Sequence, residues 1–84
     1  MKLYFRRYNQ ELVFMGEPSI EKEAWSMIHN FLEEKEFPVY YVRQYTTPEG
    51  TLIYDVGSHT EFFELEGYGQ FLAQEEERKA ESND

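Results

Sequence analysis

The chain contains no cysteine, which excludes a disulfide framework, a thiolate nucleophile and a metal site with cysteine ligands. Long apolar runs are missing as well, since no stretch approaches the roughly 18 consecutive apolar residues that cross a bilayer. The basic N-terminus is not followed by the apolar stretch of a signal peptide. We therefore expect a cytoplasmic protein without a membrane partner.

Cations are scarce in this chain: 8 Lys and Arg stand against 17 Asp and Glu, which gives a net charge of −9. Binding to nucleic acids or to anionic lipids requires clustered cations, so both classes of partner are disfavoured. The 84 residues are instead rich in aromatic side chains, with seven Tyr, seven Phe and one Trp. This composition predicts one small domain with an aromatic core.

The periodicity of apolar residues predicts a mixed fold. An apolar stripe from Ile20 to Leu32 predicts an amphipathic helix with Ser19 as its N-cap, which ends before Pro38. Strands are predicted over residues 2–8, 11–16, 39–45 and 51–56, with a short further strand over 61–65 and a short helix over 70–79.

These elements predict the fold class α+β. One amphipathic helix lies on a four- to five-stranded antiparallel sheet in a two-layer sandwich, in the order β-β-α-β-β with the further strand and a C-terminal helix added. Residues 1–69 are expected to form the single domain. Residues 70–84 are expected to form an acidic C-terminal segment that is a short helix at first and then a mobile tail.

One helix can shield only one face of the predicted sheet, so we expect the second face to be a contact surface. Tyrosine suits such a half-exposed face because its ring is apolar and its hydroxyl is polar. On the helix itself, Trp25 is expected in the core and His29 at the edge of the core. The residues predicted to bind a partner are Tyr4, Tyr8, Tyr40, Val42, Glu33 and Glu34.

The segment of residues 55–63 has the highest density of chemically capable side chains. In an enzyme, Asp55, His59 and Glu61 would form a metal-dependent or acid–base site. The chain lacks the Cys-x-x-Cys partner that accompanies His-x-Glu in zinc deaminases, which weakens this alternative. The favoured interpretation is a structural turn formed by Asp55, Gly57, Ser58 and His59. We therefore expect no catalytic residue, no metal and no cofactor.

Three stretches of the sequence carry a resemblance. They are YDVGSHTEFF at residues 54–63, IHNFLE at 28–33 and YYVR at 40–43. With them the chain resembles small uncharacterised proteins of phages and prophages of Gram-positive bacteria that share a Y-D-x-G-S-H-[ST]-x-F-F segment. The resemblance covers most of residues 1–67. It implies a small accessory protein of the bacterial cytoplasm and transfers no catalytic residue.

The leading hypothesis is a non-enzymatic protein-binding module that contacts its partner stoichiometrically. Its acidity favours a basic partner, such as a host protein that handles nucleic acid and that it would inhibit. The enzyme described above is one alternative. Another is a binder of single-stranded nucleic acid that uses Tyr4, Arg6, Arg7 and Tyr8 of the N-terminal strand. A homodimer is the alternative to a heterologous partner.

Overall fold

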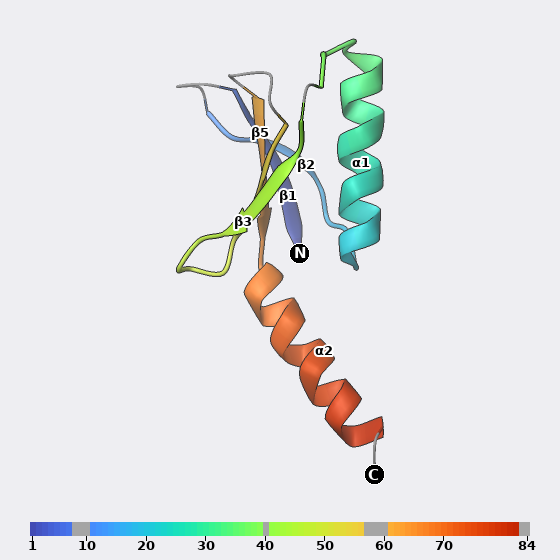
Figure 1. Cartoon of the computed structure of the whole chain (residues 1–84), viewed down its shortest axis with the longest axis vertical. Coiled ribbons are helices and arrows are strands. Elements are labelled where there is room, and N and C mark those ends of the chain that lie inside the picture. The colour runs from blue at the N-terminus through green and yellow to red at the C-terminus, as the bar shows by residue number, and fades with distance from the viewer. Residues whose placement is uncertain (8–10, 40, 57–60, 83–84) are drawn as a thin grey trace.

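The structure is a computed structural model that describes residues 1–7, 11–39, 41–56 and 61–82. The strands form one antiparallel sheet in the order β2-β1-β5-β4-β3, and α1 lies on one face of it (Figure 1). The fold is therefore α+β, as predicted. In chain order the elements are β1 (Lys2–Arg7), β2 (Val13–Gly16), α1 (Glu21–Glu34), β3 (Arg43–Thr46), β4 (Leu52–Asp55), β5 (Glu61–Glu66) and α2 (Tyr68–Ser82).

The core lies between α1 and the sheet. Phe63 of β5 is the Cα partner of Phe5 in β1 and of Tyr54 in β4, so these three side chains share one face. Phe31 of α1 packs onto that face, with ring centroids 4.7 Å from Phe5 and 5.7 Å from Phe63. The buried apolar cluster consists of Leu3, Ala24, Ile28, Leu32, Leu52, Tyr54, Val56, Phe63 and Leu65. The strand predicted for residues 51–56 is thereby confirmed. The buried helix stripe is confirmed at Ala24, Ile28 and Leu32, whereas Ile20 is exposed at the start of the helix.

The start of α1 differs from the prediction. The N-cap is Ile20, not Ser19, and Ile20 has extended backbone angles and no side-chain cap. The backbone N–H of Ser19 instead donates to the carboxylate of Glu23, at 3.2 Å. The glutamate therefore reaches back over the first turn and binds a backbone donor, which replaces the predicted hydroxyl cap.

The end of α1 is a tight C-terminal turn ahead of Pro38. The Phe37 N–H donates to the Leu32 carbonyl oxygen at 3.0 Å, and the Glu36 N–H donates to the Glu33 carbonyl oxygen at 3.1 Å. This pattern is a Schellman motif, in which the residue with positive φ is usually glycine. Here that residue is Glu36, with φ of 56°. A β-carbon at this angle costs conformational energy.

We expect Glu36→Gly to stabilise the domain by about 1 kcal/mol, because glycine adopts this left-handed conformation without strain. In a domain of this size the melting temperature should rise by about 4–8 °C, measured by circular dichroism. Glu34→Gly is the matched control, because it removes the same charge from a helical position. It should lower the stability by about 1 kcal/mol. Equal shifts for both variants would show that charge, and not the backbone angle, sets the effect.

The connection from α1 to the sheet also differs from the prediction. A strand was predicted to begin at Val39, but β3 begins at Arg43. Val39, Tyr41 and Val42 lie outside the strands instead. After β3 the chain reverses in a turn over residues 47–50, in which the Gly50 N–H donates to the Thr47 carbonyl oxygen at 2.9 Å.

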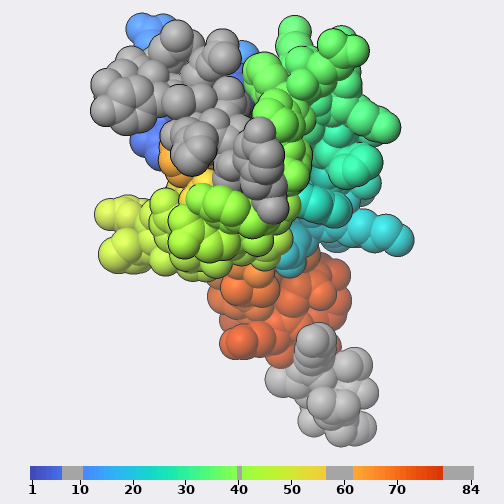
Figure 2. Space-filling view, turned by 45° about the horizontal axis from the view of Figure 1, so that its top comes forward, coloured from blue at the N-terminus to red at the C-terminus, as the bar shows by residue number. Residues whose placement is uncertain are grey.

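The C-terminal helix is longer than predicted. It begins at Tyr68, directly after Gly67, whose φ of 88° turns the chain out of β5. Its first turn is attached to the domain: the Gly69 N–H donates to the Gly50 carbonyl oxygen at 2.8 Å. From there α2 extends away from the sheet and does not lie over the face opposite α1 (Figures 1 and 2). Neither helix, within the ranges described, is long and apolar enough to cross a membrane.

Candidate functional site

A groove runs along α1, between this helix and the segment of residues 37–42 that leads into β3. A neighbouring hollow extends it to β3, and we call the whole the α1–β3 groove. Its main hollow has a volume of about 410 Å³ and a mostly apolar lining. A second hollow continues from it at Trp25 and reaches β3 and β4. The residues of the main hollow are Trp25, His29, Leu32, Glu33, Glu36, Phe37, Val39 and Val42, and the second hollow adds Glu21, Lys22, Gln44 and Tyr54.

The groove exists because α1 does not extend over the whole sheet. Phe31 packs over β1 and β5, while Trp25 reaches only as far as Tyr54 of β4, with a centroid distance of 5.9 Å. β3 lies one strand further out and is exposed along its whole length. Phe37, Val39 and Val42 of the segment before β3 line the hollow beside α1. Trp25 is therefore only partly buried, not a core residue as predicted.

The rim of the groove is negative. Glu33 and Glu36 are exposed, and neither carboxylate forms an ion pair with a residue in the described ranges. They lie at the C-terminal end of α1, where the helix dipole adds negative potential. No basic residue occupies the last turn of the helix. An apolar hollow with a few polar groups at its rim is the usual form of a binding site.

The floor of the second hollow includes a buried hydroxyl. Tyr54 is fully buried, and its hydroxyl oxygen has no hydrogen-bond partner among the residues described. Burial raises the pKa of this hydroxyl far above its ordinary value of 10, and the nearby Glu21 and Tyr68 raise it further. The Tyr68 hydroxyl donates to the Glu21 carboxylate at 3.4 Å. Tyr54 is therefore neutral in the folded protein throughout the physiological pH range.

We expect alkali to destabilise the protein through Tyr54. Below pH 10 this tyrosine is neutral in both the folded and the unfolded chain. Above pH 10 it ionises first in the unfolded chain, so the free energy of unfolding falls as the pH rises. In Tyr54→Phe this loss should be smaller, and the stability at pH 7 should be unchanged or higher by about 1 kcal/mol, because an unpaired buried hydroxyl is removed.

Urea unfolding at pH 7.5 and at pH 11, followed by circular dichroism, measures this difference. Tyr45→Phe is the control, since the Tyr45 side chain is half exposed on β3. The interpretation is wrong if Tyr54→Phe loses as much stability at pH 11 as the wild type does.

The sheet face opposite α1 has a different character, and we call it the open face. Alternation along the strands places on it Phe14, Tyr4, Phe62, Ile53 and Tyr45, together with Lys2, Arg6, Arg43, Asp55, Glu64 and Glu66. The three cations and three anions cancel. Arg6 forms an ion pair with Glu64, and Arg43 forms one with Asp55. The net charge of −9 is therefore carried by residues outside the open face.

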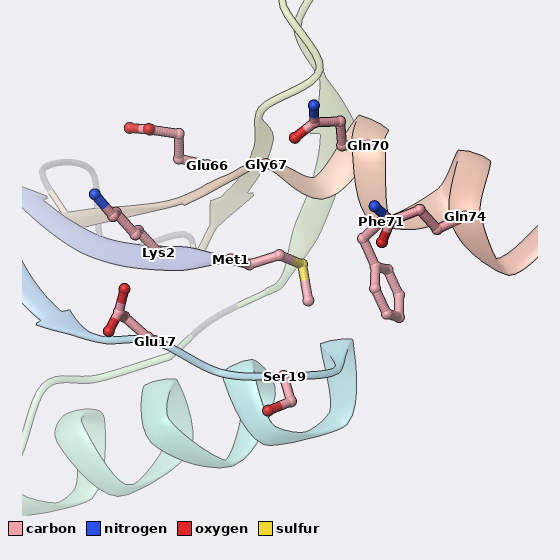
Figure 3. Close-up of a pocket in the computed structure, with 9 residues that line it drawn as sticks. All are labelled: Met1, Lys2, Glu17, Ser19, Glu66, Gly67, Gln70, Phe71 and Gln74. Atoms are coloured by element: carbon pink, nitrogen blue, oxygen red, sulfur yellow. The ribbon is translucent and has the colours of Figure 1, made fainter.

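A third hollow lies where α2 leaves the domain. It has a volume of about 350 Å³, and the side chains of Met1 and Phe71 point into it (Figure 3). Its polar groups come from β1, β5, α2 and the segment before α1, and they are spaced around the opening. Lys2, the one cation of the lining, is the Cα partner of Glu66. A polar, open hollow with its cation beside a carboxylate suits a ligand less well than the α1–β3 groove.

The structure brings together only part of the predicted site. Val42 and Glu33 meet in the α1–β3 groove, whereas Tyr4 lies on the open face. Val42 precedes β3 and lines the hollow beside α1, so it does not lie on the face with Tyr4. Glu34 is exposed at the helix end, outside the lining of the groove. Tyr8 and Tyr40 are outside the described residues.

The predicted turn can be followed only at its beginning. Asp55 ends β4, and its carboxylate accepts a hydrogen bond from the Arg43 guanidinium at 2.9 Å. Gly57, Ser58 and His59 lie outside the described residues. Glu61 begins β5, and its side chain is also outside the description. Among the residues that are described, no three His, Asp or Glu side chains group as metal ligands would.

Sequence reasoning missed several residues of the groove, namely Trp25, Phe37 and Val39. Trp25 stands on the apolar stripe of the helix, which gives no sign of where the sheet beneath it ends. Phe37 and Val39 flank Pro38, and a residue before proline is extended. Two large apolar residues around a proline directly after a helix would have been a usable signal of an exposed apolar segment.

Comparisons with models of protein families, with curated proteins and with solved structures find no match to this chain. The resemblance to phage and prophage proteins therefore stays a prediction.

Proposed function

We propose that this protein is a non-enzymatic binding module that contacts a basic protein partner stoichiometrically. The observation that carries the proposal is the α1–β3 groove, an apolar hollow whose rim carboxylates, Glu33 and Glu36, form no ion pair within the described residues. A basic partner would neutralise Glu33 and Glu36 and bury the apolar side chains behind them. Electrostatic complementarity of this kind speeds association and selects the partner.

The charge distribution favours the groove over the open face as the site for such a partner. The open face pairs its own charges, so it offers little to a basic protein beyond its aromatic rings. The sequence suggested one surface that is both aromatic and acidic. In the fold the groove combines the aromatic side chains of Trp25 and Phe37 with the carboxylates of Glu33 and Glu36.

The experiment is affinity capture from a Gram-positive bacterial lysate, with identification of captured proteins by mass spectrometry. We expect a basic protein that forms a complex of fixed stoichiometry in light scattering and dissociates as the salt concentration rises. The double variant Glu33→Gln and Glu36→Asn should capture less of it. Asparagine tolerates positive φ, so this variant keeps the helix end.

The control is a variant with the open face changed at the opposite edge of the sheet, Phe14→Ser, which keeps all charges of the groove. The proposal is wrong if the captured proteins are acidic, or if capture is insensitive to both salt and the groove variant. Turnover of a captured small molecule by the protein would also contradict a purely stoichiometric role.

A further inference from the structure

We infer that the α1–β3 groove binds an extended basic peptide segment, which adds to β3 as a sixth strand of the sheet. The inference rests on the proposed function and specifies the part of the partner that is recognised. The occupant is a β-strand with apolar side chains at alternate positions and with lysine or arginine at its ends.

The backbone of β3 supplies the first element of recognition. β3 hydrogen-bonds to β4 along one side and is the last strand of the sheet order. An edge strand presents unpaired N–H and C=O groups, which a further chain can pair with. All four of its residues are exposed, so no described segment covers this edge. Added strands of this kind derive their affinity from such main-chain hydrogen bonds.

The helix supplies the second element, a wall beside the open edge. A strand added to β3 directs every second side chain toward α1, because strand side chains alternate between faces. On that side it meets the hollow lined by Trp25, Leu32 and Val42. The hollow of about 410 Å³ holds one or two side chains the size of valine or leucine. The groove between a helix and an edge strand therefore selects apolar residues at alternate positions.

The third element is charge. Glu33 and Glu36 belong to the lining of the main hollow and lie near the negative end of the α1 dipole. A cationic side chain at the end of the added strand can reach these carboxylates. The protein as a whole repels a second copy of itself through its net charge of −9, which disfavours pairing between two β3 edges.

Binding can be followed directly because Trp25 is the single tryptophan and lies in the groove. The probe is an acetylated, amidated peptide, Lys-Lys-Val-Thr-Val-Thr-Val-Lys-Lys, titrated into the full chain at low salt. We expect a saturable change in Trp25 fluorescence. A peptide with glutamate at all four lysine positions should bind at least about tenfold more weakly.

Backbone methylation distinguishes strand addition from simple charge attraction. In one peptide the three valine nitrogens are methylated, and in another the two threonine nitrogens. Only one edge of the added strand faces β3, so one of these two peptides should lose binding and the other should retain it. Equal binding of both would overturn the inference, as would failure of the basic peptide to bind better than the acidic one.

The variant Val42→Lys places a cation at the groove and should weaken binding of the basic peptide by about tenfold. Leu12→Lys is the matched control, since Leu12 is exposed outside the strands and does not line the groove. If light scattering shows that the protein is a dimer and that Val42→Lys abolishes the dimer, the groove binds a second copy of the chain. This result would overturn the inference. If capture of a basic protein is lost in Phe14→Ser but kept in Val42→Lys, the protein still has a binding function, and only the site proposed here is contradicted.

Discussion

Replacing Phe63 by alanine is expected to unfold the domain. Phe63 is completely buried in the central strand β5, and its ring contacts those of Phe5 and Phe31 with centroid distances of 5.3 and 5.7 Å. Removing a buried phenylalanine ring costs about 3–5 kcal/mol, from lost apolar burial and from the cavity that remains. A core of this size supplies a net stability of about the same magnitude. The variant should therefore lack a cooperative thermal transition in circular dichroism at 25 °C and above.

Phe62→Ala is the matched control for this result. Phe62 precedes Phe63 in the same strand, but it lies on the open face, where the Arg6 guanidinium is 5.3 Å from its ring. Loss of this cation–π contact and of partial burial should cost about 1 kcal/mol and leave a cooperative transition. If neither variant shows a cooperative transition, the stability of the sheet depends on the backbone pairing or strand propensity of β5. The core contacts of the Phe63 ring would then not be the cause of the unfolding.

The two-layer arrangement could be predicted because it follows from the local pattern of apolar residues in each element. The alternation of Leu52, Tyr54 and Val56 and the helical stripe through Ile28 each identify the side of their element that must be buried. An amphipathic helix and several half-buried strands have few ways to bury their apolar sides, and a two-layer sandwich is one of them.

The order of strands could not be predicted in the same way. β5 lies at the centre of the sheet, between β1 and β4, although its sequence suggested only a short additional strand. Pairing between β1 and β5 joins residues about sixty positions apart, and nothing in the alternation of either strand identifies the other. Phe62 and Phe63 are adjacent aromatic residues, so this strand also lacks a clear polar side in sequence.

From the sequence, the types of residue in the binding site could be predicted, but not their arrangement. Exposed aromatic residues and acids were recognised as a contact surface, but the position of the groove depends on where β3 begins. Arg43 lies on the open face, so by alternation Val42 belongs to the side of α1. Because the chain crosses from α1 to Arg43 outside the sheet, Val39 and Val42 line an apolar hollow beside the helix.

Several residues at the end of α1 are unfavourable for the stability of an isolated helix. Glu33 and Glu34 lie in the last turn, where the helix dipole disfavours negative charge, and Glu36 holds a positive φ that glycine would adopt more easily. Departures from local preference tend to gather at functional sites. Their position at the rim of the α1–β3 groove agrees with the proposed binding of a basic partner.

The turn that returns the chain from β3 to β4 should be the second most sensitive point of the fold. Gly50 has φ of 87°, and a β-carbon built there would lie 3.4 Å from the Cα of Gly69 in α2. We expect Gly50→Ala to lower the free energy of unfolding by about 2 kcal/mol, chiefly because alanine is strained at this backbone angle. Urea unfolding followed by circular dichroism measures the loss.

Two further variants separate the possible causes of that loss. Gly50→Asn adds a β-carbon but tolerates positive φ better, so it should lose less stability than Gly50→Ala if backbone strain dominates. An equal loss in both would assign the effect to the contact with Gly69. Glu49→Ala changes an exposed residue of the same turn and should stay within about 0.5 kcal/mol of the wild type. Because this turn fixes the end of β3, Gly50→Ala should also weaken binding of the basic peptide, whereas Glu49→Ala should not.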